Sequence, residues 1–284
     1  MRRAVELQPE WLRRVPTDRR LPDGARVVHT GCGTSFHAAQ TGGDAAQALE
    51  LILSPRRDYD LLVLVSHEGE TALTVEAARA WEGPKWCVTA AATSPLARLC
   101  DEVVVCAPEI ETSWCHTASY VCAVAALAAL RGEDVSWLPD AVEDALQAAP
   151  EPVSEHERWL VAGAGRDWPT AQEAVLKLRE GAQVAAEAHQ TEQLLHGHLG
   201  AVDERVRAFV LEGEGRAAER AHAAAAALRE LGVETTLVPT RHPAVDVVRF
   251  QRLTVDLAAA RGVNPDPIRT DDERWARAWK AAHP

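Results

Sequence analysis

Three charged residues in the second half of the chain are spaced so that they share one side of a predicted helix. Thr170 is suited to be the N-cap, Glu173 closes a capping box, and the helix is predicted to extend to about Gln183. Glu173, Lys177 and Glu180 then lie on one face. From the residues alone, the simpler interpretation is a solvated ion-pair ladder worth roughly a few tenths of a kcal/mol per pair. The alternative is acid–base chemistry by a carboxylate beside a lysine charge.

Two glycine-bearing turns are the second candidate for chemistry. Residues 31–35 read GCGTS and follow a short apolar run, and residues 66–71 read SHEGET and follow the apolar run 61–65. In doubly wound sheets, ligands lie beyond the carboxyl ends of the strands, where helix N-termini bind anions. Each turn alone favours an ordinary connection in which Ser or Thr is the N-cap. Because both turns stand at equivalent places, together they favour an anion-binding site.

The elements that must position these residues are predicted from the apolar runs. The runs at 61–65 and 103–105 are continuous rather than alternating, which is typical of strands buried on both faces of a parallel sheet. Helical patterns lie between such runs, for example at 72–81. The segment 117–130 is apolar nearly all round, which predicts a buried helix.

The second half of the chain repeats the pattern of the first. A polar stretch that ends at 149–152 predicts a linker, and a strand, a Gly-rich turn and a helix follow it. The predicted fold class is therefore α/β, with two doubly wound parallel-sheet subdomains in three αβα layers. The expected boundaries are 1–24 for an N-terminal extension, 25–148 for the first domain, 153–262 for the second and 263–284 for a C-terminal tail.

Length, composition and charge narrow the function classes. The chain has 284 residues, 47% hydrophobic and 25% charged, which is enough to bury a sizeable core. A formal net charge of −12 argues against a general polyanion binder. No apolar run could span a membrane, and the N-terminus lacks the apolar stretch of a signal peptide. We therefore expect a cytoplasmic protein without nucleic-acid or membrane partners, whose six cysteines are buried free thiols.

These motifs resemble the sugar isomerase (SIS) domain family, in the tandem arrangement of the isomerase half of glucosamine-6-phosphate synthase. The resemblance rests on four segments in the same order: 31–35, 66–71, LKLRE at 176–180, and His-Gly at 196–197. It covers about residues 25 to 270 and implies two SIS subdomains. The glutamine-hydrolysing domain of that enzyme is not expected here, because position 2 has no catalytic cysteine.

In this family the two glycine-bearing turns bind a sugar phosphate. The implied substrate-binding residues are Cys32, Gly33, Thr34, Ser35, Ser66, His67, Glu68, Gly69 and Thr71. His67 replaces the family's Gln, and Glu68 replaces a Ser. A carboxylate beside a phosphate dianion in a partly desolvated site costs on the order of several kcal/mol. Either Glu68 points to solvent, or the ligand carries a polyol or an amine there instead of a simple phosphate ester.

The resemblance also implies catalytic roles. The matching helix of the family supplies a carboxylate base, and its His-Gly supplies a histidine that reaches in from the other subunit of a dimer. Here these are Glu180 and His196, with Lys177 as the charge beside an enediolate oxyanion. We therefore expect a homodimer with shared active sites. His198 departs from the family's His-Gly-Pro, but no Cys cluster or HExxH motif accompanies it, so neither a metal nor another cofactor is expected.

Lysine is scarce, and this bears on the mechanism. The only lysines are Lys85, Lys177 and Lys280. The synthase ends in a loop whose lysine forms a Schiff base with the open-chain ketose, whereas 264–274 contains none, and a protonated guanidinium cannot serve as a nucleophile. A second family lysine is also missing from 116–120, which reads HTASY. The sequence therefore favours chemistry without a covalent imine.

The predicted function is a sugar-phosphate isomerase or aminosugar-phosphate deaminase that moves protons through an enediol-type intermediate. Release of an amine from a sugar–amine adduct shares this step, and it stays open as an alternative. Two non-catalytic alternatives are a module that binds a phosphosugar or sugar derivative, and a family member that kept the fold and lost activity. Retention of Glu180 and His196 favours the enzyme.

Overall fold

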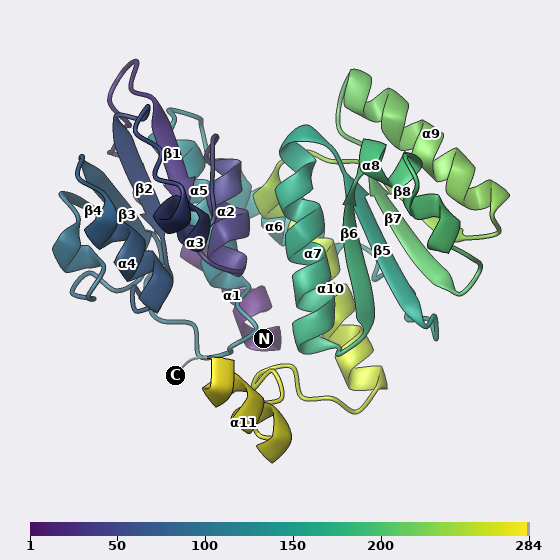
Figure 1. Cartoon of the computed structure of the whole chain (residues 1–284). Helices are drawn as coiled ribbons and strands as arrows, with labels where there is room; N and C mark the ends of the chain where they lie inside the picture. The colour runs from purple at the N-terminus through teal and green to yellow at the C-terminus, as the bar shows by residue number, and fades with distance from the viewer. Residues whose placement is uncertain (283–284) are drawn as a thin grey trace.

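The computed structural model describes residues 1–282 and contains two four-stranded parallel sheets that lie side by side (Figure 1). The first sheet has the strand order β1-β2-β3-β4, and the second has the order β6-β5-β7-β8. This confirms the predicted α/β class with two parallel-sheet units. The strands are β1 (Val27–Thr30), β2 (Leu61–Val65), β3 (Lys85–Thr89), β4 (Glu102–Val105), β5 (Arg158–Gly163), β6 (Ala185–Gln190), β7 (Val206–Leu211) and β8 (Glu234–Val238).

Helices cover both faces of the first sheet, and β2 shows why its sequence is apolar throughout. Leu61, Val63 and Val65 pack in one cluster with α2 (Thr34–Thr41) and α5 (Ala118–Leu130). Leu62 and Leu64 point the other way, toward α3 (Ala48–Leu53) and α4 (Ala72–Ala80). A strand buried on both faces needs no polar alternation, so the continuous run correctly predicted a central strand.

The second sheet has the same three layers. Trp159 and Phe209 pack on one face with α7 (Trp168–Gly181) and α10 (Pro243–Ala260). Leu160 and Val210 pack on the other face with α8 (Thr191–Leu195) and α9 (Arg216–Glu230).

The two halves meet through helices that lie between the sheets. Helix α2 packs against α7, and α5 packs against α10 (Figure 1). The N-terminal helix α1 (Arg2–Leu12) packs against α5, α6 (Leu138–Gln147) and α10, and thereby bridges the halves. A buried hydrogen bond of 2.5 Å from Gln8 Nε2 to Gln251 Oε1 joins α1 to α10. The groups that carry chemistry lie close to the contact between α2 and α7.

The capping box predicted at the start of α7 is wrong. Helix α7 begins at Trp168 with Asp167 as its N-cap, so Thr170 already lies in the first turn. The Glu173 side chain is fully buried instead of solvated, so the ladder interpretation also fails. The helix ends at Gly181, and Gln183 has a left-handed backbone with φ 55°. Tertiary contacts with the first half outweigh these local patterns.

The C-terminal segment forms an exposed helix, α11 (Glu273–Ala282), below the two halves in Figure 1. The last two residues of the tail expected over 263–284 lie outside the described residues. Asp266 forms an ion pair with the Met1 ammonium group, which ties the tail to α1. No helix within residues 1–282 is both long and apolar enough to cross a membrane.

Substitution of Trp11 by alanine tests whether α1 belongs to the core. Trp11 is 4% exposed and packs in the core of the first half. We expect Trp11→Ala to lower the free energy of unfolding by about 3–5 kcal/mol, because it leaves a cavity. Denaturant unfolding measures this, with the control Leu53→Ala at a site that is 68% exposed. Equal unfolding midpoints for the two variants would contradict the packing of α1.

Candidate active site

The two glycine-bearing turns lie together at the carboxyl end of the first sheet. The first turn ends at the start of α2, and the second leads into α4 with Thr71 as its N-cap. The Cys32 Sγ lies 3.7 Å from the Thr74 Oγ1 of α4, so the first turn contacts the helix that follows the second. The Ser66 and Thr71 hydroxyls lie 3.3 Å apart. The structure therefore brings the predicted turns to one edge of the sheet, as the parallel topology requires.

A cavity opens beside these turns. Its lining residues with polar groups are Thr34, Ser35, His67, His116, Ser119 and Tyr120. Of the predicted substrate-binding residues, Thr34, Ser35 and His67 line it directly. Glu68 is exposed and is absent from the lining, which agrees with the first of the two alternatives for this residue.

The N-terminus of α5 forms one wall of the cavity and is held by a buried carboxylate. Glu111 accepts hydrogen bonds of 2.8–3.0 Å from the backbone N–H and hydroxyl groups of both Thr117 and Ser119. A negative charge at this position stabilises the positive end of the helix dipole. The backbone N–H of Glu111 donates to His67 Nε2 at 2.7 Å, so the same residue also orients the cavity histidine.

His67 is neutral and carries a donor without a protein partner. Because its Nε2 accepts a hydrogen bond, the proton of the neutral ring must be on Nδ1. Burial, with a smaller contribution from His116, lowers the pKa of His67 from 6.5 to about 3. Within residues 1–282, Nδ1 has no hydrogen-bond partner although it is buried. A buried donor of this kind needs an acceptor from a ligand or from water.

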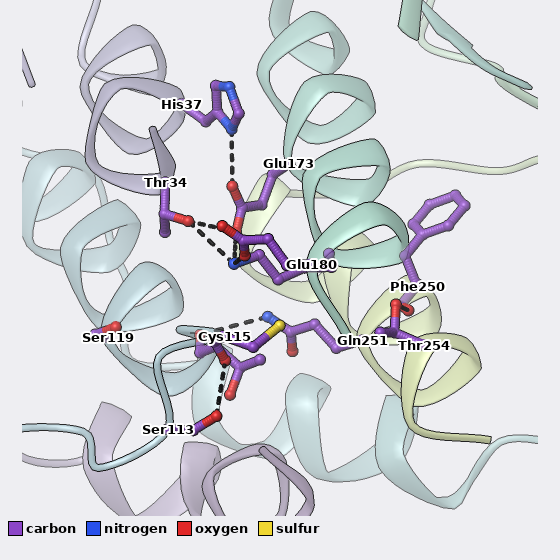
Figure 2. A network of polar contacts seen from close by, with 12 residues as sticks. Thr34, His37, Ser113, Cys115, Ser119, Glu173, Glu180, Phe250, Gln251 and Thr254 are labelled. Atoms are coloured by element: carbon purple, nitrogen blue, oxygen red, sulfur yellow. Dashed lines mark hydrogen bonds and ion pairs between the residues drawn. The ribbon is translucent and has the colours of Figure 1, made fainter. Parts of the chain in front are cut away.

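Charged groups of α7 approach the first turn from the second half of the chain (Figure 2). The Lys177 ammonium lies 2.6 Å from Glu180 Oε2 and 3.4 Å from Glu173 Oε1, and it donates to Thr34 Oγ1 at 3.1 Å. His37 Nδ1 donates to Glu173 Oε2 at 2.8 Å. The predicted face of the helix is therefore real, but its partners are the partly buried residues Thr34 and His37 of α2.

Lys177 remains protonated in this environment. Its side chain is fully buried, and burial by itself would lower its pKa. The carboxylates of Glu173 and Glu180 outweigh burial and raise the pKa of Lys177 above its usual value. Lys177 can therefore act as a fixed positive charge, as the sequence indicated, and not as a nucleophile.

The structure does not bring His196 to Glu180 within one chain. His196 follows α8, is 72% exposed, and lies 2.9 Å from Glu192 Oε1 through its Nε2. Glu180 is 21% exposed, so its carboxylate is accessible from outside the chain. The missing lysine has no substitute near the cluster: the tail between residues 264 and 274 contains none, and Lys280 lies on the exposed helix α11.

Sequence reasoning missed His37, Glu111, His116, Ser119 and Tyr120. Their signals were weak: His37 lies one helical turn after Thr34, and Glu111 stands in a loop that has no periodicity. His189 and His198 have ring centroids 4.5 Å apart. In the described part of the chain, however, no three His, Cys, Asp or Glu side chains are grouped so that they could hold a metal ion.

Comparison with known proteins finds a family match within the second half. Residues 153–267 match the SIS domain. The chain is 27% identical, over 85% of its own length, to the glutamine–fructose-6-phosphate aminotransferase (isomerizing) of Pyrococcus horikoshii, and covers 50% of that protein. The chain thus spans about half the length of the curated relatives it matches. These matches confirm the resemblance to SIS proteins, and the family model itself matches residues 153–267.

Solved structures share the fold of the whole chain. The C-terminal domain of glucosamine-fructose-6-phosphate aminotransferase from Francisella tularensis superposes with a TM-score of 0.77 at 18% identity, over 93% of this chain and 96% of that one. Glucosamine-6-phosphate deaminase from Thermotoga maritima gives a TM-score of 0.75 at 19% identity, with the same coverage. At such identities the likeness establishes the two-sheet SIS fold.

Replacement of His67 by glutamine should change the pH dependence of stability. Because its pKa falls from 6.5 to about 3 on folding, the folded state binds fewer protons between these values, and stability is lost as the pH falls below 6.5. For these two pKa values, the loss between pH 7.5 and pH 5 amounts to about 2 kcal/mol. We expect denaturant unfolding to show that the unsubstituted chain loses this much more than His67→Gln does. His222→Gln, at an exposed histidine, is the control, and it should lose as much as the unsubstituted chain.

Proposed function

We propose that this chain is a sugar-phosphate isomerase or aminosugar-phosphate deaminase. The observation that carries the proposal is the contact of Lys177 with both Glu180 and Thr34, at 2.6 and 3.1 Å. It holds the acid–base face of α7 against the candidate phosphate turn of the first half. The relatives agree in chemistry, since they are named for fructose-6-phosphate amination with isomerisation and for glucosamine-6-phosphate deamination.

In the proposed reaction, Glu180 acts as the base. Its carboxylate removes the proton from the sugar carbon next to the carbonyl group, and the electron pair of the broken C–H bond forms an enediolate. The positive charge of Lys177, which is fully buried and keeps its protein partners, favours the negative charge of the enediolate through its electric field, without contact and without loss of its own proton. Glu180 then returns the proton to the neighbouring carbon, while the hydroxyl proton of the enediolate passes from one oxygen to the other, so that the old carbonyl oxygen becomes a hydroxyl group and the new carbonyl group forms. Glu173 and His37 position Lys177 and do not contact the substrate.

The candidate phosphate site uses neutral donors. Thr34, Ser35 and His67 line the cavity, the N-terminus of α2 forms part of its wall, and His67 Nδ1 is a buried donor without a protein partner within residues 1–282. Helix N-termini and hydroxyl groups favour a bound dianion. The exposure of Glu68 supports a phosphate ester as the ligand, because its carboxylate is not forced into the cavity.

His196 is proposed to act from the partner subunit of a homodimer. Its side chain is largely exposed on this chain and is distant from its own Glu180 network, in which it takes no part. A neighbouring copy would place His196 of the partner subunit over the site, where an imidazole can transfer the proton of the ring hydroxyl.

Replacement of Glu180 by glutamine should abolish proton transfer but leave binding intact. We expect Glu180→Gln to slow the exchange of carbon-bound hydrogen of fructose 6-phosphate into D2O by about 100-fold or more. NMR measures the exchange, and ammonia release from glucosamine 6-phosphate reports the deaminase. Glu187→Gln, at an exposed glutamate on β6, is the matched control and should retain full activity. An unchanged exchange rate in Glu180→Gln would refute the assignment of the base.

A mixing experiment tests the shared site. Glu180→Gln and His196→Asn chains should each be inactive alone. If the site takes His196 from the partner subunit, each mixed dimer regains one intact site, because one chain retains Glu180 and the other retains His196. Random reassociation of equal amounts should therefore restore about a quarter of the original activity. No recovery, or a monomer by light scattering, would contradict the shared site.

The alternative is a binding module without catalysis. In that case fructose 6-phosphate would raise the melting temperature of the chain, while neither hydrogen exchange nor ammonia release would occur.

A further inference from the structure

The internal duplication creates a second cavity at the place that corresponds to the first. In both halves a strand leads through a glycine turn to a helix, with Gly33 and Gly165 at φ 54° and 57°. A Cβ on Gly31 would lie 2.7 Å from the Ser35 backbone, and one on Gly163 would lie 2.8 Å from the Asp167 backbone. The turns are therefore built alike, and α7 and α10 of the second half correspond to α2 and α5 of the first.

The sheets support the same correspondence. In the second sheet, β5 has the edge strand β6 on one side and β7 on the other. In the first sheet, β1 has β2 on one side and an isolated parallel bridge from His29 to Ala45 on the other. This bridge is the remnant of an edge strand, so β1 and β5 hold equivalent central positions.

The second cavity is lined by three arginines, with His242, Thr41 and one carboxylate, that of Glu133, which pairs with Arg131. It has a volume of about 400 Å³, which lies within the range of small-molecule sites. Arg166 comes from the turn before α7, Arg241 from the start of α10, and Arg131 from the end of α5. The side of α2 completes it through Gln40 and Thr41, so both halves of the chain contribute. Arginines converge here although the net charge of the chain is −12.

Two donors of this cavity are available to a ligand. Within residues 1–282, Arg241 has no carboxylate partner, and its guanidinium lies 5.3 Å from the centre of the Trp137 ring. His242 Nδ1 accepts from the backbone N–H of Ala244, so the neutral ring carries its proton on Nε2. Burial lowers the pKa of His242 to about 4, which keeps the ring neutral near pH 7.

The acidic groups nearby leave these donors accessible. Arg131 pairs with Glu133 and Arg166 with Glu214, each at 2.7 Å, but both pairs are solvent-exposed and therefore weak enough to be rearranged. Asp167 and Asp246 are buried outside the lining. The Asp246 carboxylate accepts the backbone N–H of Arg241, and burial raises its pKa to about 7, which reduces its negative charge.

We propose that the cavity between Arg131, Arg166 and Arg241 is a second ligand site, which binds the phosphate group of a small phosphorylated metabolite. Each planar guanidinium group can donate two parallel hydrogen bonds to two oxygens of a phosphate group. Arg241 and the Nε2–H of His242 provide the first donors, and Arg166 and Arg131 turn from their carboxylates to the ligand. The site is separate from the proposed active site and does not depend on catalysis there.

Calorimetric titration with fructose 6-phosphate tests the second site. We expect two binding events per chain, and we expect the double variant Arg166→Ala/Arg241→Ala to weaken one of them at least ten-fold. Arg216→Ala removes the charge of an exposed arginine at the start of α9 and should change neither event. Because both cavity arginines are solvent-accessible, the double variant should keep the unfolding midpoint of the unsubstituted chain, which denaturant unfolding checks.

The calorimetric test of the second site gives an answer whether or not the proposed reaction is correct. A variant with Thr34→Val and Ser35→Ala should lose the other binding event and keep the one that depends on Arg241. If the active-site proposal fails, the event that depends on Arg241 should persist as the only one. If every binding event survives the double arginine substitution, or if Arg216→Ala weakens binding equally, the second site is refuted.

Discussion

The burial of one ammonium group constrains the whole site. Moving an isolated ion from water into the protein interior costs roughly several kcal/mol in lost hydration, even after the protein relaxes around it. Lys177 has no exposed surface, so its charge must be balanced inside the protein. Its balancing groups come from both halves: Glu173 and Glu180 from its own helix, and the Thr34 hydroxyl from α2. The docking of α2 on α7 therefore completes the hydrogen bonding of the ammonium group, and separation of the two halves would break this hydrogen bond.

The same constraint explains why the chemistry lies between the halves. Thr34 is the first residue of α2 and so belongs to the turn that ends the first central strand. Its hydroxyl donates to Glu173 Oε1 at 3.3 Å and accepts from Lys177, while His37 holds the other oxygen of Glu173. Among Glu173, Lys177 and Glu180 of α7, only Glu180 is partly exposed. The network thus fixes the position of the Lys177 ammonium group and leaves the Glu180 carboxylate partly exposed toward a ligand. This arrangement suits a fixed charge next to a base.

The two halves share a scaffold and differ in the polar residues that they place on it. The first half presents neutral donors and a neutral His67 around its cavity, whereas the second presents three arginines. In both halves the glycine turn exists because a side chain at its first position would strike the following backbone. Fold and site are therefore separable: the turn geometry is kept, and the ligand chemistry changes with the residues that follow it.

The sequence by itself determined the buried strand at 61–65, the two-unit α/β class, the glycine turns, and the face shared by Glu173, Lys177 and Glu180, because each depends on local periodicity and backbone sterics. The scarcity of lysine, which weakens a covalent mechanism, was also visible there. Only the tertiary structure decided that this face is buried, that α7 starts before Thr170, and that His67 presents an unpartnered Nδ1–H. Burial and tautomer are set by neighbours far away in the chain, and Lys177 and Thr34 are separated by 143 positions. No local pattern encodes such a pairing, since it arises only when the two halves pack.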